Sequence, residues 1–440
     1  MSTSILISGC QSFEPEPLDA SKHISEWEAR SADTEAVRNF VNRLQKTQHG
    51  PVQFDLTDGL DLEEGELISL IYNTSLRLER LKAGIAEASS ENAGLWEDPE
   101  FNINLLRITE SIPNPWTLSS ALSFTVPISG RLEIEKKRAD AEHTAALIHV
   151  AESEWNVSLQ LRNAWVKWSA LQLEMEESER TARVLESIVE SQTALLESGE
   201  IREIEAGLFS IESTSHRMEI ARLQGELEQG EQRIKALLGL QPKASVNLVP
   251  RINLDKSEVT GTFAEDNLTL ERLATEYSIA ELRLKEEIRK QYPDLKIGPQ
   301  YESDEGDSSW GAISAIGLPL LNRNKADIAE AEAKRDVARS AYEAELEHLS
   351  GQLFNLLARR NALLEQQQIL KEQLVPKVDR QLARSKQLLE IGEGSVTLLM
   401  DGVIRSHQAK LRLIQLQAEE SELNNEIRHL QGPTDRFREF

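Results

Sequence analysis

One stretch of the chain, from Arg131 to Ser198, contains neither proline nor glycine. These two residues are the commonest interruptions of a helix, so their absence predicts a single continuous helix. At 1.5 Å per residue such a helix would be about 100 Å long. A globular core cannot use a helix of that length, and the chain is therefore expected to be elongated.

The same landmarks occur twice along the sequence. Val126-Pro127-Ile128, at the end of an apolar stretch, is followed 192 positions later by Leu318-Pro319-Leu320. The segment LLESGE at 195–200 returns 193 positions later as LLEIGE at 388–393. Two further pairs of landmarks keep nearly the same offset: Pro99 with Pro293, and Gly239 with Gly432. The chain is therefore predicted to be two copies of one structural unit.

Each copy has the same expected order of elements. A short amphipathic helix precedes two strands, which lead into a long helix, a tight glycine turn and a long return helix. In the return helix of the first copy the inward positions have the heptad spacing of helices packed side by side. They are Ile220, Leu223, Leu227, Gly230, Ile234 and Leu237. The second copy repeats this register at Leu413, Leu416, Glu420, Leu423, Ile427 and Leu430.

In each copy, apolar and polar residues alternate in the segments between the two landmark prolines, as they do in the strands of a hairpin. Four apolar side chains are predicted to face outward: Phe101, Ile103, Phe124 and Leu295. A turn is expected around Pro113 in the first copy and over the acidic stretch Ser303–Ser309 in the second. Each strand would have about 9 to 11 residues, the length that a tilted strand needs to cross a bilayer.

Two tryptophans, Trp116 and Trp310, fall near the strand ends. They fit equally well as aromatic residues at a membrane interface and as ordinary packing at a loop base. The second copy also differs from the first at Pro376, which lies inside its outgoing helix. Because proline lacks an N–H group and clashes with the preceding turn, a bend or an interruption is predicted there.

The composition excludes several classes of function. The chain has 49 Lys+Arg against 74 Asp+Glu and a formal charge of −25, whereas a nucleic-acid partner requires a basic face. No phosphate-binding glycine loop, nucleophile elbow or H-E-x-x-H motif occurs. His143 and His149 are predicted to lie on a solvated helix face, and Trp155, Trp165 and Trp168 to pack between helices. We therefore expect no enzyme, no metal site, no cofactor and no nucleic-acid partner.

The only cysteine, Cys10, follows Ile7-Ser8-Gly9. This segment resembles the lipobox of bacterial lipoproteins, and Gln11 stands where Asp commonly marks inner-membrane retention. Residues 1–10 are therefore expected to be a truncated lipoprotein signal with Cys10 as the acylation site. Nine residues precede Cys10 and none is basic, whereas a secretory signal usually has a basic start and 15 to 30 residues. The alternative is a chance cysteine in a frayed terminus.

Taken together, the motifs resemble the TolC family of bacterial outer-membrane efflux ducts over nearly all of residues 60–432. They are DPEF and YPDL before the strands, VPISGR and LPLLNR after them, and the glycine turns LLESGEIREIE and LLEIGEGSVTLLMD. The resemblance implies a mainly α fold with a β-barrel part, in which duplicated helical hairpins and two β-hairpins build a trimeric duct. It also implies an outer-membrane location with a periplasmic tunnel, and a passive role beside an adaptor protein and an inner-membrane pump.

The resemblance further suggests which residues line the tunnel entrance. The helix tips would be the turns at Gly199 and Gly392, where glycine can adopt positive φ. In the family, carboxylates on the helix after the second turn line the narrowest part of the closed entrance. Asp401 matches one such position, whereas Leu398 stands where a second carboxylate is often found. Glu205 is a possible substitute from the first copy, and the alternative is that both acids are ordinary surface residues.

The expected organisation follows from these landmarks. The signal at 1–10 and an N-terminal extension at 11–60 come first. Repeat 1 covers 61–242, with strands at about 99–127 and long helices at about 131–238, and a linker follows at 243–262. Repeat 2 covers 263–432, with strands at about 293–319 and long helices at about 325–430, and a tail ends the chain at 433–440. The competing interpretation is a periplasmic coiled-coil adaptor or scaffold, which would also have long helical hairpins. An adaptor should carry lipoyl-like and β-barrel segments around one hairpin, whereas two strand pairs precede two equal helical pairs here.

Overall fold

The computed structural model describes residues 13–46, 54–109, 112–113, 115–252, 267–304, 307–319 and 321–433. Cys10 lies outside these residues. The backbone of Glu205 is described, but its side chain is not. No helix among the described residues is long and apolar enough to cross a bilayer.

The first copy begins after two N-terminal helices, α1 (Ala20–Glu28) and α2 (Glu35–Lys46). Its own elements are α3 (Leu62–Tyr72), α4 (Thr74–Glu91), β1 (Glu100–Arg107), β2 (Trp116–Val126), α5 (Arg131–Glu197) and α6 (Glu203–Leu237). The continuous helix predicted from Arg131 is present, because α5 has 67 residues without a break.

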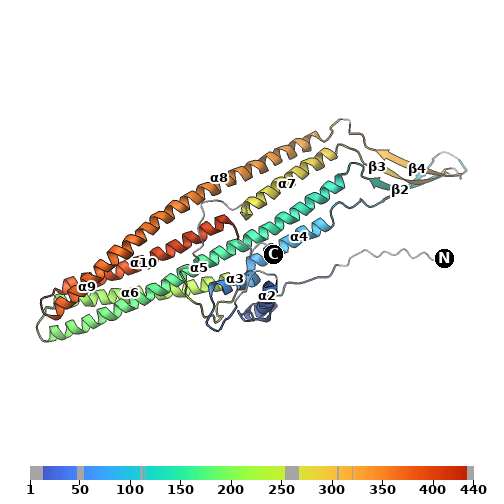
Figure 1. Cartoon of the computed structure of the whole chain (residues 1–440). Coiled ribbons are helices and arrows are strands. Elements are labelled where there is room, and N and C mark those ends of the chain that lie inside the picture. Colours follow the sequence, from blue (N-terminus) through green and yellow to red (C-terminus); the bar gives the residue numbers. More distant parts are fainter. Residues whose placement is uncertain are drawn as a thin grey trace.

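Among the residues that the structure describes, the second copy repeats this order with one helix before its strands. Its elements are α7 (Leu268–Arg289), β3 (Leu295–Asp304), β4 (Asp307–Ile316), α8 (Lys325–Ile369), a π-helical turn η1 (Leu370–Leu374), α9 (Val375–Glu390) and α10 (Val396–Gln431). Figure 1 shows the long helices running side by side, with the strands at one end of the molecule and the turns between outgoing and return helices at the other. The chain is therefore elongated.

An asparagine clamp occurs at the same place in both copies. Asn73 caps the N-terminus of α4, and its Nδ2 donates a hydrogen bond of 2.9 Å to the carbonyl of Leu237 at the end of α6. Asn267 caps α7 and donates an equal bond of 2.9 Å to the carbonyl of Leu430 near the end of α10. Each clamp fastens the helix before the strands to the return helix of its own copy, so the duplication extends to single hydrogen bonds.

The π-helical turn explains why the offset between the copies changes. The offset is 192 at Pro127 and Pro319 but 193 at Gly199 and Gly392, so the second copy has one more residue between these landmarks. A π-helical turn takes up one additional residue without shifting the helix that follows. It lies immediately before Pro376, where an interruption was predicted.

The four strands form one antiparallel sheet in the order β1-β2-β3-β4. The two hairpins are joined by β2 and β3, in which Phe124 lies opposite Ile297. The predicted turn from Ser303 to Ser309 is wrong in extent. Ser303 pairs with Ser308 and Asp304 with Asp307, because backbone pairing between neighbouring strands outweighs the low strand preference of Asp and Ser.

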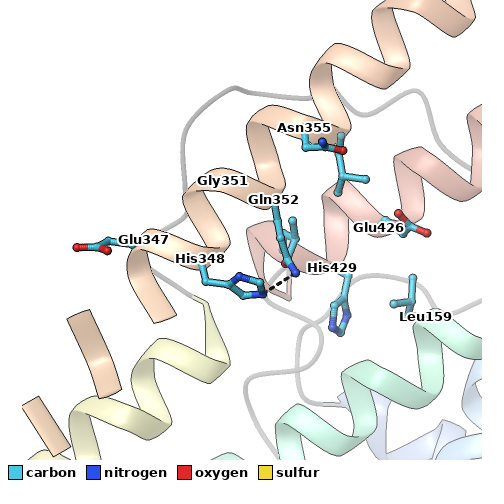
Figure 2. Close-up of a pocket in the computed structure, with 10 residues that line it drawn as sticks. Leu159, Glu347, His348, Gly351, Gln352, Asn355, Glu426 and His429 are labelled. Carbon is cyan, nitrogen blue, oxygen red and sulfur yellow. Dashed lines mark hydrogen bonds between the residues drawn. The ribbon is translucent and has the colours of Figure 1, made fainter. Parts of the chain in front are cut away.

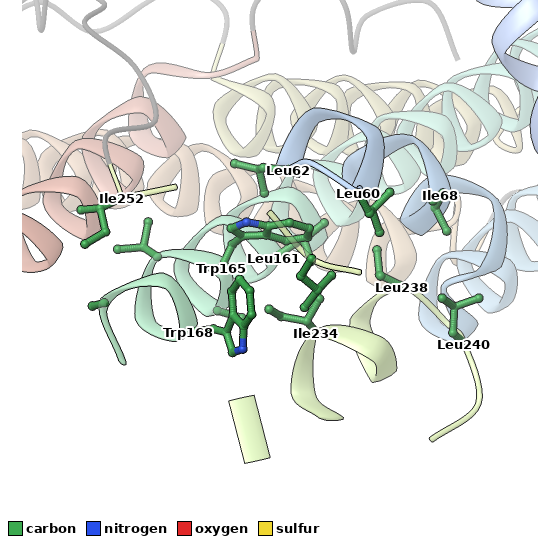
Figure 3. Close-up of a cluster of buried hydrophobic side chains, with 14 of the residues drawn as sticks. Leu60, Leu62, Ile68, Leu161, Trp165, Trp168, Ile234, Leu238, Leu240 and Ile252 are labelled. Carbon is green, nitrogen blue, oxygen red and sulfur yellow. The ribbon is translucent and has the colours of Figure 1, made fainter. Parts of the chain in front are cut away.

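The largest core lies about halfway along the molecule, where α3 covers α5 and α6 (Figure 3). Trp165 is completely buried there, and its Nε1 donates a hydrogen bond of 2.9 Å to the carbonyl of Val249. The return helix presents part of its predicted seam to this core, since Ile234 lies within it, Leu227 and Leu237 pack against it, and Gly230 faces the ring of Trp168. Trp155 and Trp168 are also buried, which confirms that these tryptophans pack between helices.

A buried ion pair attaches α3 to α5 in the first copy. Arg162 donates hydrogen bonds of 2.6 and 2.8 Å to the two oxygens of Glu66, and Ser158 donates a further bond to the same carboxylate. At the offset of 192, Arg162 corresponds to Phe354 on α8, which is exposed. The second copy therefore has no arginine at the position of Arg162.

Candidate functional site

The sheet has one apolar and one polar face. The pairing register places Phe101 opposite Leu122, Phe124 opposite Ile297, and Leu295 opposite Ile316, so these side chains share one face. The face continues through Ile103, Leu105, Leu118, Tyr301 and Trp310. The four residues predicted to face outward, Phe101, Ile103, Phe124 and Leu295, all belong to it.

The apolar face is not covered by any described part of the chain. Phe101 and Ile103 are more than 60% exposed and Trp310 is 79% exposed. The opposite face carries mostly small and polar side chains, which include Asn102, Asn104, Ser119, Gln300 and Glu302. An exposed apolar surface of this extent is unusual for a soluble monomer and marks a contact with lipid or protein.

The two tryptophans on this face lie on different strands, Trp116 on the inner strand β2 and Trp310 on the edge strand β4. Trp116 begins β2, where the guanidinium of Arg107 lies 5.6 Å from its ring centre. Trp310 packs against Tyr301 with ring centres 5.1 Å apart. Both rings remain more than half exposed, so the described residues provide no enclosed packing site for either of them.

At the other end of the molecule, both helical hairpins close through the same turn. Gly199 and Gly392 adopt φ of +78° and +77°, a region that favours glycine. In the first turn the N–H groups of Gly199 and Glu200 bond to the carbonyls of Leu196 and Leu195, at 3.0 and 2.9 Å. The residues from Leu388 to Glu393 repeat both bonds at 3.1 and 3.0 Å. These are Schellman motifs, and they place both glycines at the helix tips.

Asp401 lies in the second turn of α10, close to the tip. Its carboxylate accepts hydrogen bonds from Nε of Arg405, which lies 2.8 Å from both oxygens. The Asp401 and Arg405 side chains are 42% and 61% exposed. Leu398 is exposed one turn earlier, and the backbone of Glu205 lies in the first turn of α6. The structure therefore places Asp401 and Glu205 near the two tips, on different return helices.

A polar network joins the two copies a few turns above the tips. The ammonium group of Lys410 on α10 lies 3.5 Å from the Glu177 carboxylate on α5 and 3.9 Å from that of Asp379 on α9. The hydroxyl of Ser406 donates a hydrogen bond of 2.7 Å to Asp379. Sequence reasoning did not find this network, because its members come from three helices and share no motif.

An apolar cluster closes the tip region below this network. It combines Leu185 of α5, Phe209 of α6, and Leu399 and Val403 of α10, all almost fully buried. The packed tip therefore uses side chains from both copies. Helices from the two halves of the sequence cannot move apart here without exposing this cluster to water.

A hollow of about 600 Å³ lies between α5, α8 and α10 in the central band. Figure 2 shows that His348, Gln352 and Asn355 reach it from one side and Glu426 and His429 from the other. A hydrogen bond of 2.8 Å joins the side chains of His348 and Gln352. In the first copy, α3 packs on the corresponding part of α5. The described residues hold no group of three or more His, Cys, Asp or Glu side chains that could bind a metal ion.

Of the predicted surface histidines, His149 is half exposed, and its ring nitrogens lie 3.4 and 3.5 Å from the carboxylates of Glu152 and Glu79. It lies on the solvated side of α5, as predicted. Sequence reasoning missed a different pair, His216 and His407, which are both buried. No signal in the sequence links them, because 190 residues separate them and neither belongs to a motif.

No protein-family model matches the sequence, and no curated protein sequence matches it. Solved structures do match. The outer membrane protein VceC of Vibrio cholerae superposes with a TM-score of 0.73 at 18% identity, over 84% of this chain and 96% of VceC. CusC superposes with a TM-score of 0.73 at 15% identity, over 88% and 96% of the two chains.

A third match is the open state of the MtrE outer membrane channel of Neisseria gonorrhoeae. Its TM-score is 0.68 at 18% identity, over 84% of this chain and 89% of MtrE. These three matches cover 84 to 88% of this chain and 89 to 96% of the matched chains. The chain therefore has the fold of the TolC family of outer-membrane channels.

Proposed function

We propose that this chain is the outer-membrane channel subunit of a tripartite efflux or secretion system. Three copies would form a passive exit duct, with the sheets in the outer membrane and the long helices as a tunnel in the periplasm. The observation that supports this most directly is the two-faced sheet at one end of helices about 100 Å long. An apolar outer face and a polar inner face are what a water-filled duct in lipid requires.

The trimer follows from the edges of the sheet. Among the described residues, β1 and β4 each pair with one neighbour only, so each leaves an unpaired backbone edge. Unpaired N–H and C=O groups are too costly in hydrocarbon, and closure removes them. Pairing of β4 with β1 of the next copy would close twelve strands from three chains.

The partners are an adaptor protein and an inner-membrane pump that meet the duct at the helix tips. The chain itself would perform no chemistry. The competing adaptor interpretation fits less well, because the chain has two hairpin pairs and matches channels over 84 to 88% of its length. Acylation of Cys10 would add a second attachment to the outer-membrane lipid. A mature N-terminal peptide that spans Gly9 and an unmodified Cys10 in mass spectrometry would disprove this anchor.

The test of the main proposal compares the two faces of the sheet. Ile103→Arg and Ile297→Arg place a charge on the apolar face, and this should cost about 2 to 4 kcal/mol near the bilayer midplane. Folding assays into lipid vesicles should then show reduced insertion of both variants. Asn104→Arg is the matched control, because it adds the same side chain one position away on the polar face.

The two outcomes separate the proposals. Loss of insertion for Ile103→Arg and Ile297→Arg, with insertion retained for Asn104→Arg, supports a sheet that faces lipid on one side. Equal insertion of all three variants, or a wild-type protein that stays in solution without detergent, would favour the periplasmic scaffold instead.

A further inference from the structure

Two buried imidazoles connect the return helices of the two copies. His216 on α6 and His407 on α10 lie with ring centres 4.7 Å apart and ring planes tilted by 55°. Their exposed fractions are 7% and 6%. Both helices pack on α5. The ring contact links α6 and α10 to each other directly.

The elements around the pair supply few groups that could stabilise a second positive charge. On α5, the Thr181 hydroxyl lies 3.1 Å from Nδ1 of His407, and Glu177 is already paired with Lys410. On α10, Lys410 itself is a cation near His407. The apolar tip cluster lies next to the pair, with Val403 one turn before His407.

Helix α6 contributes the acidic groups nearest to the pair. Glu212 places a carboxylate oxygen 3.6 Å from Nδ1 of His216, and Glu219 also faces the pair. Nε2 of His216 is buried and has no hydrogen-bond partner. A proton on each ring would place two like charges within 5 Å of each other in a buried site.

Burial lowers the pKa of His407 from its ordinary value of 6.5 to about 4, and the nearby His216 and Lys410 act in the same direction. Glu219 opposes this shift. Because the folded-state pKa lies below that of a free histidine, His407 stays neutral at neutral pH and takes up its proton only in acid. The stability of the folded chain should fall as the pH drops from about 6.5 to about 4.

We propose that the His216–His407 pair is a proton-sensitive joint that holds α6 and α10 together near the tips when it is neutral and separates them when it is protonated. Two facts of geometry support it: both rings are buried in contact, and the pair bridges helices from different copies. In a channel, the separation would widen the entrance in acid, and this consequence rests on the proposed function.

The joint is tested by measuring the distance between α6 and α10 as the pH changes. Ser215 and Gln408 are exposed and flank the two histidines, so Ser215→Cys and Gln408→Cys in a Cys10→Ser background provide sites for spin labels. Labelled protein is diluted with unlabelled protein, so that distances within one chain dominate double electron–electron resonance. We expect the distance to lengthen or broaden as the pH falls through about 4, and to recover on neutralisation.

Matched variants distinguish the joint from general acid effects on the many carboxylates. The double variant His216→Gln/His407→Gln keeps polar side chains that cannot be protonated, and it should abolish the change. His149→Gln, at a half-exposed histidine of α5, should leave the change intact. Circular dichroism at both pH values checks that the helices persist.

The proposal is overturned if the wild-type distance is the same at pH 7 and pH 4, or if the double variant shows the same change as the wild type. Conductance across a planar bilayer is recorded on the same samples. A change in distance without any channel activity would support the joint and count against the proposed function. Channel activity with an invariant distance would do the reverse.

Discussion

Asp401 illustrates how a single residue near the tip can be judged only with its neighbours. The resemblance assigns it to the narrowest part of the entrance, where three carboxylates around an axis would attract cations and hinder anions. In the structure the Asp401 carboxylate forms an ion pair with Arg405, one helical turn further on. If both side chains line the entrance, the ring is a set of ion pairs, and its selectivity is weaker than that of bare carboxylates.

This arrangement predicts opposite effects for two substitutions. Asp401→Asn should reduce the preference for cations and leave Arg405 uncompensated, whereas Arg405→Gln should increase it by releasing the carboxylate. Reversal potentials of single channels in a salt gradient measure both. Glu133→Gln is the control, because Glu133 forms a similar exposed pair with Lys137 at the sheet end of α5. If neither substitution moves the reversal potential more than the control does, Asp401 is an ordinary surface residue.

At the scale of elements, the π-helical turn compensates for one extra residue. An α-helix turns by about 100° per residue, so an uncompensated insertion would rotate everything beyond it onto the wrong face. The residues on both sides of η1, among them Leu363 and Val378, pack into one cluster with Leu416 and Leu423 of α10. The π-helical turn thus preserves the register of α9 against α10.

Removal of this extra residue should therefore be tolerated. Deletion of the exposed Glu372, combined with Pro376→Ala to restore the N–H group, should give a continuous helix with α9 still in register. Deletion of the exposed Glu186 from the uninterrupted α5 has no such compensation and should displace Val189 and Gln192 from their packing. Thermal unfolding followed by circular dichroism should show a small change for the first variant and a large loss for the second. Comparable losses in both would contradict this role for the π-helical turn.

The elements that sequence reasoning predicted well are those fixed by periodicity. The 67-residue α5 and the seam through Leu223 and Ile234 follow from helical spacing alone, because long runs leave no alternative. The hairpin between Ser303 and Ser309 was misjudged, because pairing between strands depends on neighbours that local preference does not describe. The polar network of Lys410 and the pair of His216 with His407 lay beyond prediction, since both depend on side chains brought together by tertiary packing.

For the whole molecule, the duplication predicts how copies of the chain meet. Within one chain, α5 of the first copy packs on α7 and α10 of the second. By repetition, α8 should pack in the same way on α4 and α6 of a neighbouring chain. The faces concerned carry exposed apolar side chains, which include Val337 and Phe354 on α8, Leu81 and Ile85 on α4, and Ile211 and Met218 on α6. A ring of three chains would cover all of them.

The same repetition predicts an ion pair between neighbouring chains, where the helices meet the sheet. Within one chain, Arg131 at the start of α5 lies 3.0 Å from the carboxylate of Asp294 before β3. The offsets of 192 and 194 at the neighbouring landmarks make Arg323 the counterpart of Arg131, and Glu100 the counterpart of Asp294. Arg323 should therefore pair with Glu100 of the next chain in the ring.

Charge exchange tests this contact directly. Arg323→Glu alone should lower the temperature at which the trimer dissociates in detergent, by an amount that reflects about 0.2 to 1 kcal/mol for each of the pairs. Adding Glu100→Arg should restore part of the lost dissociation temperature, because the pair then forms with reversed charges. Glu100 also lies 3.0 Å from Lys296 of its own chain, so Lys296→Gln measures the share of any loss that arises within one chain. If the decrease in dissociation temperature of the double variant equals the sum of the decreases of the two single variants, Arg323 and Glu100 do not pair across the interface.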